Sequence, residues 1–315
     1  MEKPEIENLR FNENEAAASK KRKKKRKKII LFTLLGILLI IVFFAVDISV
    51  RVGGMFSAVH APVETEDLRD EELVLGDDPF SLLILGIDGG RSDTMMLVTV
   101  NPNQNSTYML SIARDTMAYI VGHGSTTRIN HAYAYGGAQM SINTVQRLLD
   151  VPIDFYMELE MDGFGPLVNA VGGVTVYNEF AFSEGGHHFP AGEINLSGDQ
   201  ALAYVRMRMQ DPRGDFGRQE RQRDVVESIV REMAGVGVVT RYQNILNAVG
   251  DSLFTDLALA DMIAISTGYT GALGNIVSLE LGGTGQMVNG MSLQVVPEYQ
   301  RLEMSSRLRN HLGLE

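Results

Sequence analysis

The sequence contains no cysteine, and beyond its N-terminal region it contains no lysine. The absence of cysteine excludes disulfides, zinc–thiolate sites and thiol nucleophiles. Every lysine lies at or before Lys28, and the seventeen basic residues that follow are all arginines. A Walker-type phosphate loop and a Schiff-base mechanism both require a lysine, so neither can operate in the main part of the chain.

The motifs of common hydrolytic enzymes are also missing. The sequence has no G-x-S-x-G, no H-E-x-x-H and no Ser-His-Asp order. His187 and His188 lie in a glycine-rich segment without metal-ligand spacing to the other histidines, which argues against a zinc enzyme. We interpret His131 as a packed or hydrogen-bonded histidine rather than a catalytic base.

The N-terminal region differs in charge and hydropathy from the rest of the chain. The net charge is −11, but residues 1–28 carry +6 and the remainder carries −17. The basic block at 20–28 precedes eighteen uncharged residues at 29–46, which span roughly 27 Å as a helix and predict a transmembrane anchor. A cleaved signal peptide is the alternative, although its apolar part is typically only about 7–15 residues long.

The basic block predicts the orientation of the anchor, because positive residues stay on the cytoplasmic side. We therefore expect a single-pass plasma-membrane protein with a cytoplasmic N-terminus and an extracellular C-terminal domain. The predicted parts are a disordered basic tail (1–28), the anchor (29–46), an acidic connector (47–78) and one folded domain (79–315). A nucleic-acid-binding patch is the other interpretation of the basic block, and we reject it beside a membrane span.

The folded domain is predicted to be α/β, with a mixed central sheet in a three-layer α/β/α arrangement. Apolar runs predict strands at 80–88, 95–101, 107–114, 154–160 and 174–178. Helical spacing predicts helices at 138–150, 162–173, 197–205, 216–235, 241–253 and 256–267. Strands mixed with helices in this way are typical of a sheet covered by helices on both faces.

Aspartates and arginines follow the first predicted strand. Asp88 ends the strand, and a Gly-Gly pair then predicts a tight turn that carries Arg91 and Asp93. Two carboxylates beside an arginine can hold Mg²⁺ together with an anionic group, because Mg²⁺ prefers hard oxygen ligands and substrate phosphates. The alternative is an Asp-Gly turn with a surface ion pair.

Two more arginines lie where predicted strands and loops meet. Arg114 ends an apolar strand, and Arg128 precedes the polar segment Asn130–Tyr133. A structural salt bridge from Arg114 to Asp115 or another nearby acid is the alternative to anion binding.

The densest concentration of arginine lies between Tyr204 and Arg223, YVRMRMQDPRGDFGRQERQR. Alternation of polar and apolar residues predicts an extended Tyr204–Met209 with Arg206 and Arg208 on one face. Arg218, Arg221 and Gln222 are spaced to share one face of the next helix. We expect four of these arginines (206, 208, 218 and 221) to converge on an anion, with Arg213 and Arg223 at the surface. The alternative is a solvated helix face in which Glu220, Asp224 and Glu227 pair with these arginines.

Five segments in this order behind one anchor resemble the LytR-CpsA-Psr family: LGIDGGRSDTMMLVTVNP, SIARDT, RINHAYAYGG, INLSGDQALAYVRMR and DFGRQERQR. The resemblance implies an extracellular phosphotransferase of Gram-positive bacteria with an apolar cleft for a polyprenyl tail. Such an enzyme moves an anionic glycopolymer, such as wall teichoic acid, from undecaprenyl pyrophosphate to peptidoglycan through a phosphodiester. Ala113 departs from the family pattern, in which proline is commoner before Arg-Asp-Thr.

The resemblance also implies roles for individual residues. Asp88 and Asp93 would bind Mg²⁺, and together with Arg114 they would be catalytic. The residues expected to bind or support the pyrophosphate are Arg91, Arg114, Arg128, Arg206, Arg208, Asp215, Arg218, Arg221 and Gln222.

Two other functions stay open on the sequence alone. The same residues would suit a hydrolase of polyprenyl pyrophosphates, since they do not distinguish water from a sugar hydroxyl. A non-enzymatic envelope protein that binds polymer or acts in regulation is the other alternative. Residues 236–315 carry no identifiable chemistry and are expected to complete the core.

Overall fold

The computed structural model describes residues 59–63, 68–69, 73–233 and 238–314, all within the unit Met55–Glu315. The predicted tail (1–28) and anchor (29–46) lie outside the described residues. Within the described ranges, no helix is long and apolar enough to cross a membrane.

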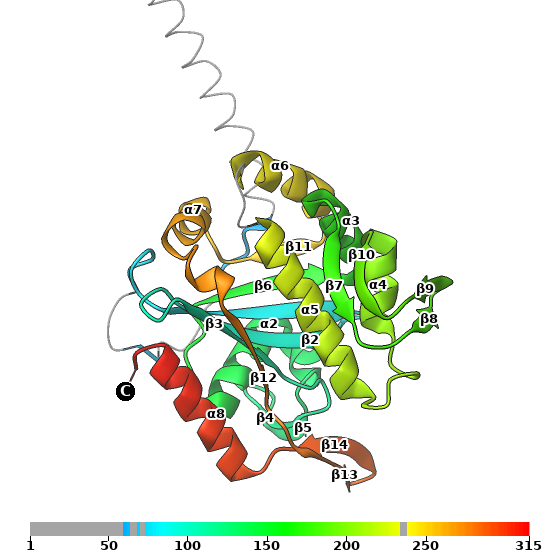
Figure 1. Cartoon of the computed structure of the whole chain (residues 1–315). Helices are drawn as coiled ribbons and strands as arrows, with labels where there is room; N and C mark the ends of the chain where they lie inside the picture. The colour runs from blue at the N-terminus through cyan, green and yellow to red at the C-terminus, as the bar shows by residue number, and fades with distance from the viewer. Residues whose placement is uncertain (1–58, 64–67, 70–72, 234–237, 315) are drawn as a thin grey trace, which may run out of the picture. The chain divides into compact units, whose positions relative to one another are not determined.

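A six-stranded mixed sheet forms the centre of the domain, in the order β11-β6-β1-β2-β3-β12 (Figure 1). β1 is antiparallel to β2 and parallel to β6, while β3 is antiparallel to β2 and parallel to β12. The six strands are β1 (Phe80–Asp88), β2 (Arg91–Asn101), β3 (Ser106–Ser111), β6 (Phe155–Glu160), β11 (Leu253–Thr255) and β12 (Ile276–Glu280).

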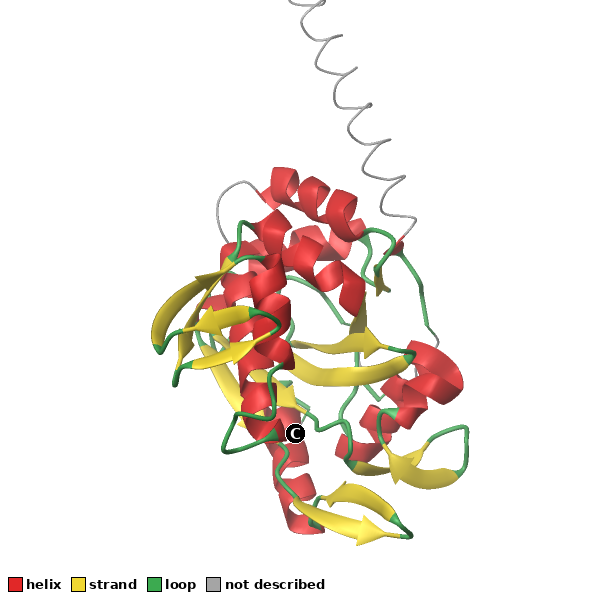
Figure 2. Cartoon of the chain, turned by 90° about the vertical axis from the view of Figure 1, so that its right-hand side faces the viewer, coloured by secondary structure: helices red, strands yellow, loops and turns green. Residues whose placement is uncertain are grey.

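Helices cover both faces of this sheet, which confirms the mixed α/β prediction (Figures 1 and 2). Leu83 and Leu85 of β1 are fully buried in one core cluster, and Ile84 between them packs against a cluster on the opposite face. This alternation follows from the two-residue period of a strand. One face carries α2 (His131–Leu149) and α8 (Glu298–His311). The other carries α3 (Met161–Val171), α4 (Gly198–Arg206), α5 (Asp215–Met233), α6 (Val238–Val249) and α7 (Leu259–Gly268).

Short antiparallel pairs and one 3₁₀ turn complete the domain. The pairs are β4 (Met117–Ile120) with β5 (Ser125–Arg128), β7 (Val174–Asn178) with β10 (Gly192–Leu196), β8 (Phe182–Glu184) with β9 (His187–Phe189), and β13 (Thr284–Val288) with β14 (Met291–Val295). The 3₁₀ turn η1 spans Ala272–Gly274.

Two boundaries differ from the sequence prediction for local reasons. The strand predicted at 107–114 ends at Ser111, so Ala113 and Arg114 lie in a loop. The helix predicted from 138 begins at His131. A kink at Gly137, where φ is +63°, separates its first turn from the part that was predicted. Part of the predicted connector also packs with the domain, since Val59 is fully buried and Ala61 N–H donates to Thr255 O at 2.7 Å.

Candidate active site

The hairpin between β1 and β2 presents the two predicted metal-binding aspartates. Gly89 and Gly90 form its two-residue turn with φ +55° and +75°, a conformation that glycine adopts without strain. Asp88 pairs with Arg91 across this turn, so Arg91 and Asp93 lie on β2. The prediction that the turn itself carries these two residues is therefore wrong. The ladder pairs Ile87 with Ser92 and then shifts register.

The register shift is a bulge that leaves Asp93 without a cross-strand partner. Gly86 faces Thr94 and Ile87 faces Ser92, so Asp93 is the extra residue of β2. Bulges re-aim side chains and are frequent beside active sites. Gly86 permits this packing, because a Cβ there would lie 2.9 Å from the Thr94 Cβ.

Arg114 binds the aspartate that the bulge presents. Its Nη1 lies 2.9 Å from Asp93 Oδ2, in a hydrogen-bonded ion pair that is partly exposed. Burial opposes the charged form of Arg114, but the pair with Asp93, helped by Asp115 and Asp215, raises its pKa overall. The partner is therefore Asp93 and not the adjacent Asp115, and Arg114 stays a cation at the edge of the sheet.

Arg206 reaches the same sheet edge from the end of α4. The extended conformation predicted for Tyr204–Met209 is wrong, because α4 continues through Arg206. The helix begins with a capping box in which Ser197 N–H donates to Gln200 Oε1 at 3.0 Å, and it ends where Met207 turns extended (φ −61°, ψ 128°). Arg206 Nη2 lies 3.5 Å from Asp88 Oδ2, in a loose and half-exposed pair.

Arg208 and Arg218 meet at Asp215 in the first turn of α5. Arg218 Nη2 lies 2.5 Å and Arg208 Nε 3.7 Å from Asp215 Oδ1. Burial lowers the pKa of Arg218, and the nearby Arg114 and Arg208 act in the same direction, whereas Asp215 opposes them. The Arg218 side chain is 12% exposed. A desolvated cation beside two others gains strongly from an anion.

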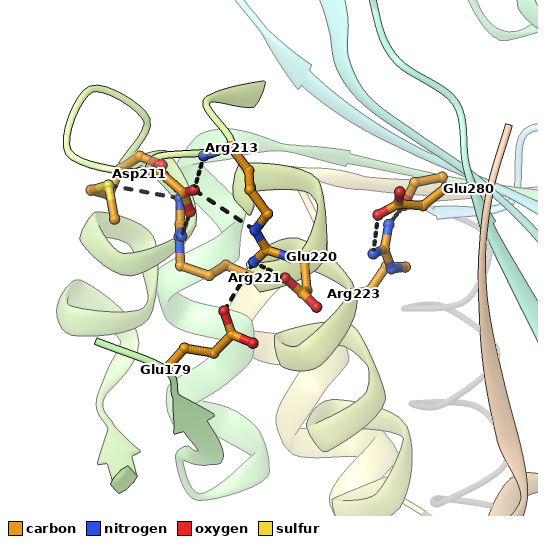
Figure 3. A network of polar contacts seen from close by, with 9 residues as sticks. Glu179, Asp211, Arg213, Glu220, Arg221, Arg223 and Glu280 are labelled. Atoms are coloured by element: carbon orange, nitrogen blue, oxygen red, sulfur yellow. Dashed lines mark hydrogen bonds and ion pairs between the residues drawn. The ribbon is translucent and has the colours of Figure 1, made fainter. Parts of the chain in front are cut away.

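Arg221 and Arg223 do not join this group. Arg221 lies in the interior, where Nη1 is 2.5 Å from Asp211 Oδ2 and the side chain is 6% exposed (Figure 3). The predicted convergence of four arginines is therefore wrong for Arg221. Arg223, predicted at the surface, is buried and binds Glu280 Oε1 and Ser111 Oγ. Arg213 is at the surface as predicted, paired with Glu179 and Glu220.

The C-terminal region supports the loop that carries Arg114. Gln294 N–H of β14 donates to Asp115 O at 2.8 Å, and Arg128 Nε lies 3.3 Å from both Ser292 O and Asp115 Oδ1. Residues 236–315 thus contribute to the surroundings of the site, which the sequence did not indicate.

Strand ends, two loops and two helices together place a positively charged set of side chains at one side of the sheet. The ion pairs and electrostatic contacts above connect Asp93, Arg114, Arg208, Asp215 and Arg218 directly. Arg91 is exposed and lies close to His131. The pKa of His131 is lowered mainly by burial, and the positive charge of Arg91 lowers it further. Gln222 is half-buried, one helical turn after Arg218. Six arginines (91, 114, 128, 206, 208, 218) and four aspartates (88, 93, 115, 215) leave a net charge of +2, which suits a phosphate or pyrophosphate.

The donor set also fits Mg²⁺. Asp88 and Asp93 each use Oδ2 for an arginine, and no bond of either Oδ1 atom is found within the described residues. Two such oxygens suffice for an ion that takes its remaining ligands from water and substrate phosphates. The described part of the chain holds no group of three or more His, Cys, Asp or Glu arranged for a metal.

A cavity of about 540 Å³ lies between β7, β10 and α5, away from this set. Its lining includes the carboxylates of Glu179, Glu193, Glu220, Asp224 and Glu227. This polar lining does not suit the polyprenyl tail that the resemblance implied. Burial, reinforced by Glu220, raises the pKa of Asp224 to about 7.

Asp224→Asn should stabilise the domain at pH 8 by much more than it does near pH 4–5. An unfolded aspartate has a pKa of about 3.9. Because the folded pKa is raised, the folded state holds the proton more tightly, and stability is lost as pH rises from about 4 to about 7. Removing the carboxylate should recover about 1 kcal/mol or more at pH 8, roughly 2–4 °C in Tm.

Thermal unfolding of the full chain at both pH values measures this effect. Glu193→Gln, which removes an exposed carboxylate from the same cavity, is the matched control and should leave Tm unchanged at both. An equal shift of Tm by Asp224→Asn at pH 5 and pH 8 would contradict the buried, protonated carboxyl.

Comparison with known proteins decides the family. The model of the LytR_cpsA_psr family matches residues 49–310. The chain belongs to the LytR_cpsA_psr family. The identification made on five sequence segments is thereby confirmed over most of the chain.

Named relatives are similar over about three quarters or more of their length. A Halalkalibacterium halodurans protein, the polyisoprenyl-teichoic acid–peptidoglycan teichoic acid transferase TagU, is 46% identical over 267 residues, covering 81% of this chain and 88% of its own. The Bacillus subtilis protein of that name is 43% identical over 226 residues, covering 70% and 74%.

Solved structures agree with the fold. The crystal structure of B. subtilis TagU has a TM-score of 0.64 at 41% identity, covering 75% of this chain and 97% of that one. A structure of TagT bound to LIIa-WTA has a TM-score of 0.70 at 31% identity, covering 81% and 100%.

The sequence did not single out Asp211, which binds Arg221, and it offered Asp115 only as a possible partner of Arg114 and not of Arg128. A signal for Asp211 was present, since an arginine on the inner face of a helix requires a buried acid. Asp211 lies in the irregular segment DPRGD, ten residues before Arg221, so the spacing of the sequence did not indicate that the two residues pair.

Proposed function

We propose that this protein transfers an anionic glycopolymer of the teichoic acid type from a polyprenyl-pyrophosphate carrier to peptidoglycan. The observation that carries the proposal is the set of arginines around Asp88, Asp93 and Asp215 in a LytR_cpsA_psr domain. Relatives at 41–46% identity are named teichoic acid–peptidoglycan transferases, and the similar TagT structure is bound to LIIa-WTA.

In this reaction the arginines hold the pyrophosphate and stabilise the charge that develops on the leaving group. An acceptor hydroxyl oxygen of peptidoglycan forms a bond to the sugar-linked phosphorus, and the bond from that phosphorus to the bridging oxygen breaks. Polyprenyl phosphate leaves and a phosphodiester remains. Arg114, Arg206 and Arg218 supply fixed positive charge for this step, and such preorganised charge is usually the largest catalytic contribution.

A carboxylate at the sheet edge takes the proton of the acceptor hydroxyl. Asp88 is the more available of the two, because its side chain is 48% exposed and its pair with Arg206 is 3.5 Å long. Asp93 is bound more closely to Arg114, at 2.9 Å. Mg²⁺ held by Asp88 and Asp93 would neutralise phosphate charge when bound.

We further propose that residues 29–46 anchor the domain on the outer face of the plasma membrane. The basic block at 20–28 supports this orientation, and it brings the site to the membrane in which a polyprenyl carrier resides.

The purified full chain should join lipid-linked polymer covalently to peptidoglycan fragments. Mass spectrometry of the product should show a new phosphodiester between polymer and glycan, together with release of polyprenyl phosphate. Release of free phosphorylated polymer at the same rate with and without peptidoglycan would identify a hydrolase instead. Tight binding without turnover would support the non-enzymatic alternative.

A further inference from the structure

The segment that carries Arg208 has no regular secondary structure of its own. Residues 207–214 connect the end of α4 to the start of α5 and consist of turns. Arg208 is 46% exposed, and its distance of 3.7 Å from Asp215 is too long for a strong hydrogen bond. Something other than a helix or a strand must therefore fix the direction in which Arg208 points.

A buried ion pair beneath the segment supplies that support. Arg221 Nη2 donates to Met207 O at 2.5 Å, while its Nη1 donates to Asp211 Oδ2 at 2.5 Å (Figure 3). The Asp211 side chain is 0% exposed, and its Oδ1 accepts the Arg213 N–H at 2.7 Å. Asp211 therefore binds the segment at one end and, through Arg221, the Met207–Arg208 peptide at the other.

The surroundings hold this pair in one arrangement. The Arg221 guanidinium carbon lies 5.5 Å from the ring centroid of Phe182 and 5.9 Å from that of Tyr204. A buried pair of this kind adds little net stability, because desolvation offsets its attraction, and fixing a conformation is its best-attested role.

Gly217 makes room for Asp211 on the first turn of α5. A Cβ at this position would lie 1.9 Å from Asp211 Oδ2 and 2.3 Å from its Cγ. The φ of Gly217 is not in the left-handed region, so glycine is required here for space and not for backbone conformation.

We propose that Asp211, with the room that Gly217 gives it, is a positioning residue for phosphoryl transfer. Through Arg221 it fixes the Met207–Arg208 peptide so that Arg208 meets the phosphate beside Arg218. The Asp211 N–H also donates to Arg208 O at 3.2 Å, while no contact of the Asp211 carboxylate with the side chain of Arg208 or Arg218 is found within the described residues. The proposal rests on the proposed transferase function.

Asp211→Asn should lower polymer transfer by about tenfold to a hundredfold, the scale expected when a binding group is displaced by about 1 Å. Asparagine keeps the size of the side chain, and Tm reports whether the variant folds. Arg213→Ala is the matched control. It removes an exposed arginine from the same segment but keeps the N–H that Asp211 accepts, so transfer should be unchanged.

Combining this change with Arg208→Ala separates positioning from general support. If Asp211 acts through Arg208, Asp211→Asn should cost much less in the Arg208→Ala background than in the wild type. An equal loss in both backgrounds, or full transfer by Asp211→Asn alone, would overturn the proposal. Gly217→Ala should show the same pattern, and it decides the matter if Asp211→Asn fails to fold.

The affinity for farnesyl pyrophosphate, a soluble polyprenyl pyrophosphate, gives a readout that does not depend on polymer transfer. The same set of variants should weaken its binding with the same dependence on Arg208. A wild-type protein that binds this probe but transfers no polymer would refute the transferase, while the binding data would still decide the role of Asp211.

Discussion

Arg218→Ala should reduce polymer transfer by about a hundredfold to a thousandfold, the loss typical when one preorganised charge donor is removed. The Arg218 side chain is 12% exposed and lies in an ion pair with Asp215, close to Arg114 and Arg208. Its buried guanidinium gains more from a phosphate than an exposed one does. Transfer of lipid-linked polymer to peptidoglycan by the full chain measures the effect.

The fold should tolerate this change. After Arg218 is removed, Asp215 keeps a hydrogen bond from Gln219 Nε2 at 3.1 Å and the nearby Arg208. Arg231→Ala on the same helix is the matched control, because its side chain is 60% exposed and paired with Glu227. Arg206→Ala should also impair transfer. Full transfer by both Arg218→Ala and Arg206→Ala would refute the arginine site.

The sequence predicted well those features that depend on local pattern. The apolar run at 80–88 became β1, one of the two central strands of the mixed sheet, and Ser197 caps the start of α4 as expected. The Gly-Gly pair after Asp88 forms the expected tight turn. Each of these features follows from the period of a strand, a helix cap or a turn conformation, which a few neighbouring residues determine.

Features that depend on tertiary contacts could not be predicted in the same way. Alternation in Tyr204–Met209 favoured an extended chain, but Tyr204, Val205 and Met207 are all buried, and Arg221 holds the Met207 carbonyl. The partner of Arg223 is Glu280, fifty-seven residues later. Helical spacing gives the faces of α5 but not what each face contacts, so surface and interior arginines look alike in sequence.

The C-terminal hairpin shows the same limit. Residues 284–295 carry no charge and no motif, and they were expected only to complete the core. Their contribution comes from backbone atoms, since Gln294 N–H binds Asp115 O and Ser292 O accepts from Arg128. Backbone hydrogen bonds across more than one hundred residues leave no mark in side-chain chemistry, so sequence alone could not assign this hairpin to the site.

Removal of divalent cations is expected to lower transfer by about a hundredfold or more, and added Mg²⁺ should restore it. The carboxylates of Asp88 and Asp93 lie beside the arginines that we propose to hold the pyrophosphate, and they would hold a hard dication that offsets phosphate charge. The measurement is the rate of transfer by the full chain after treatment with a chelator and then across a range of Mg²⁺ concentrations.

Asp88→Asn and Asp93→Asn should both raise the Mg²⁺ concentration needed for half-maximal transfer, whereas Asp251→Asn, an exposed aspartate outside the site, should not. The two variants should also differ from each other. Asp93 holds Arg114 at 2.9 Å, so its loss also frees an arginine and should lower the rate at saturating Mg²⁺. Asp88 pairs only loosely with Arg206 and is the proposed base, so Asp88→Asn should lower the rate at saturating Mg²⁺ through the lost proton acceptor and not through a displaced arginine. Transfer that is unaffected by the chelator would refute the metal while leaving the arginine site intact, because Arg114, Arg206 and Arg218 would then neutralise the pyrophosphate alone.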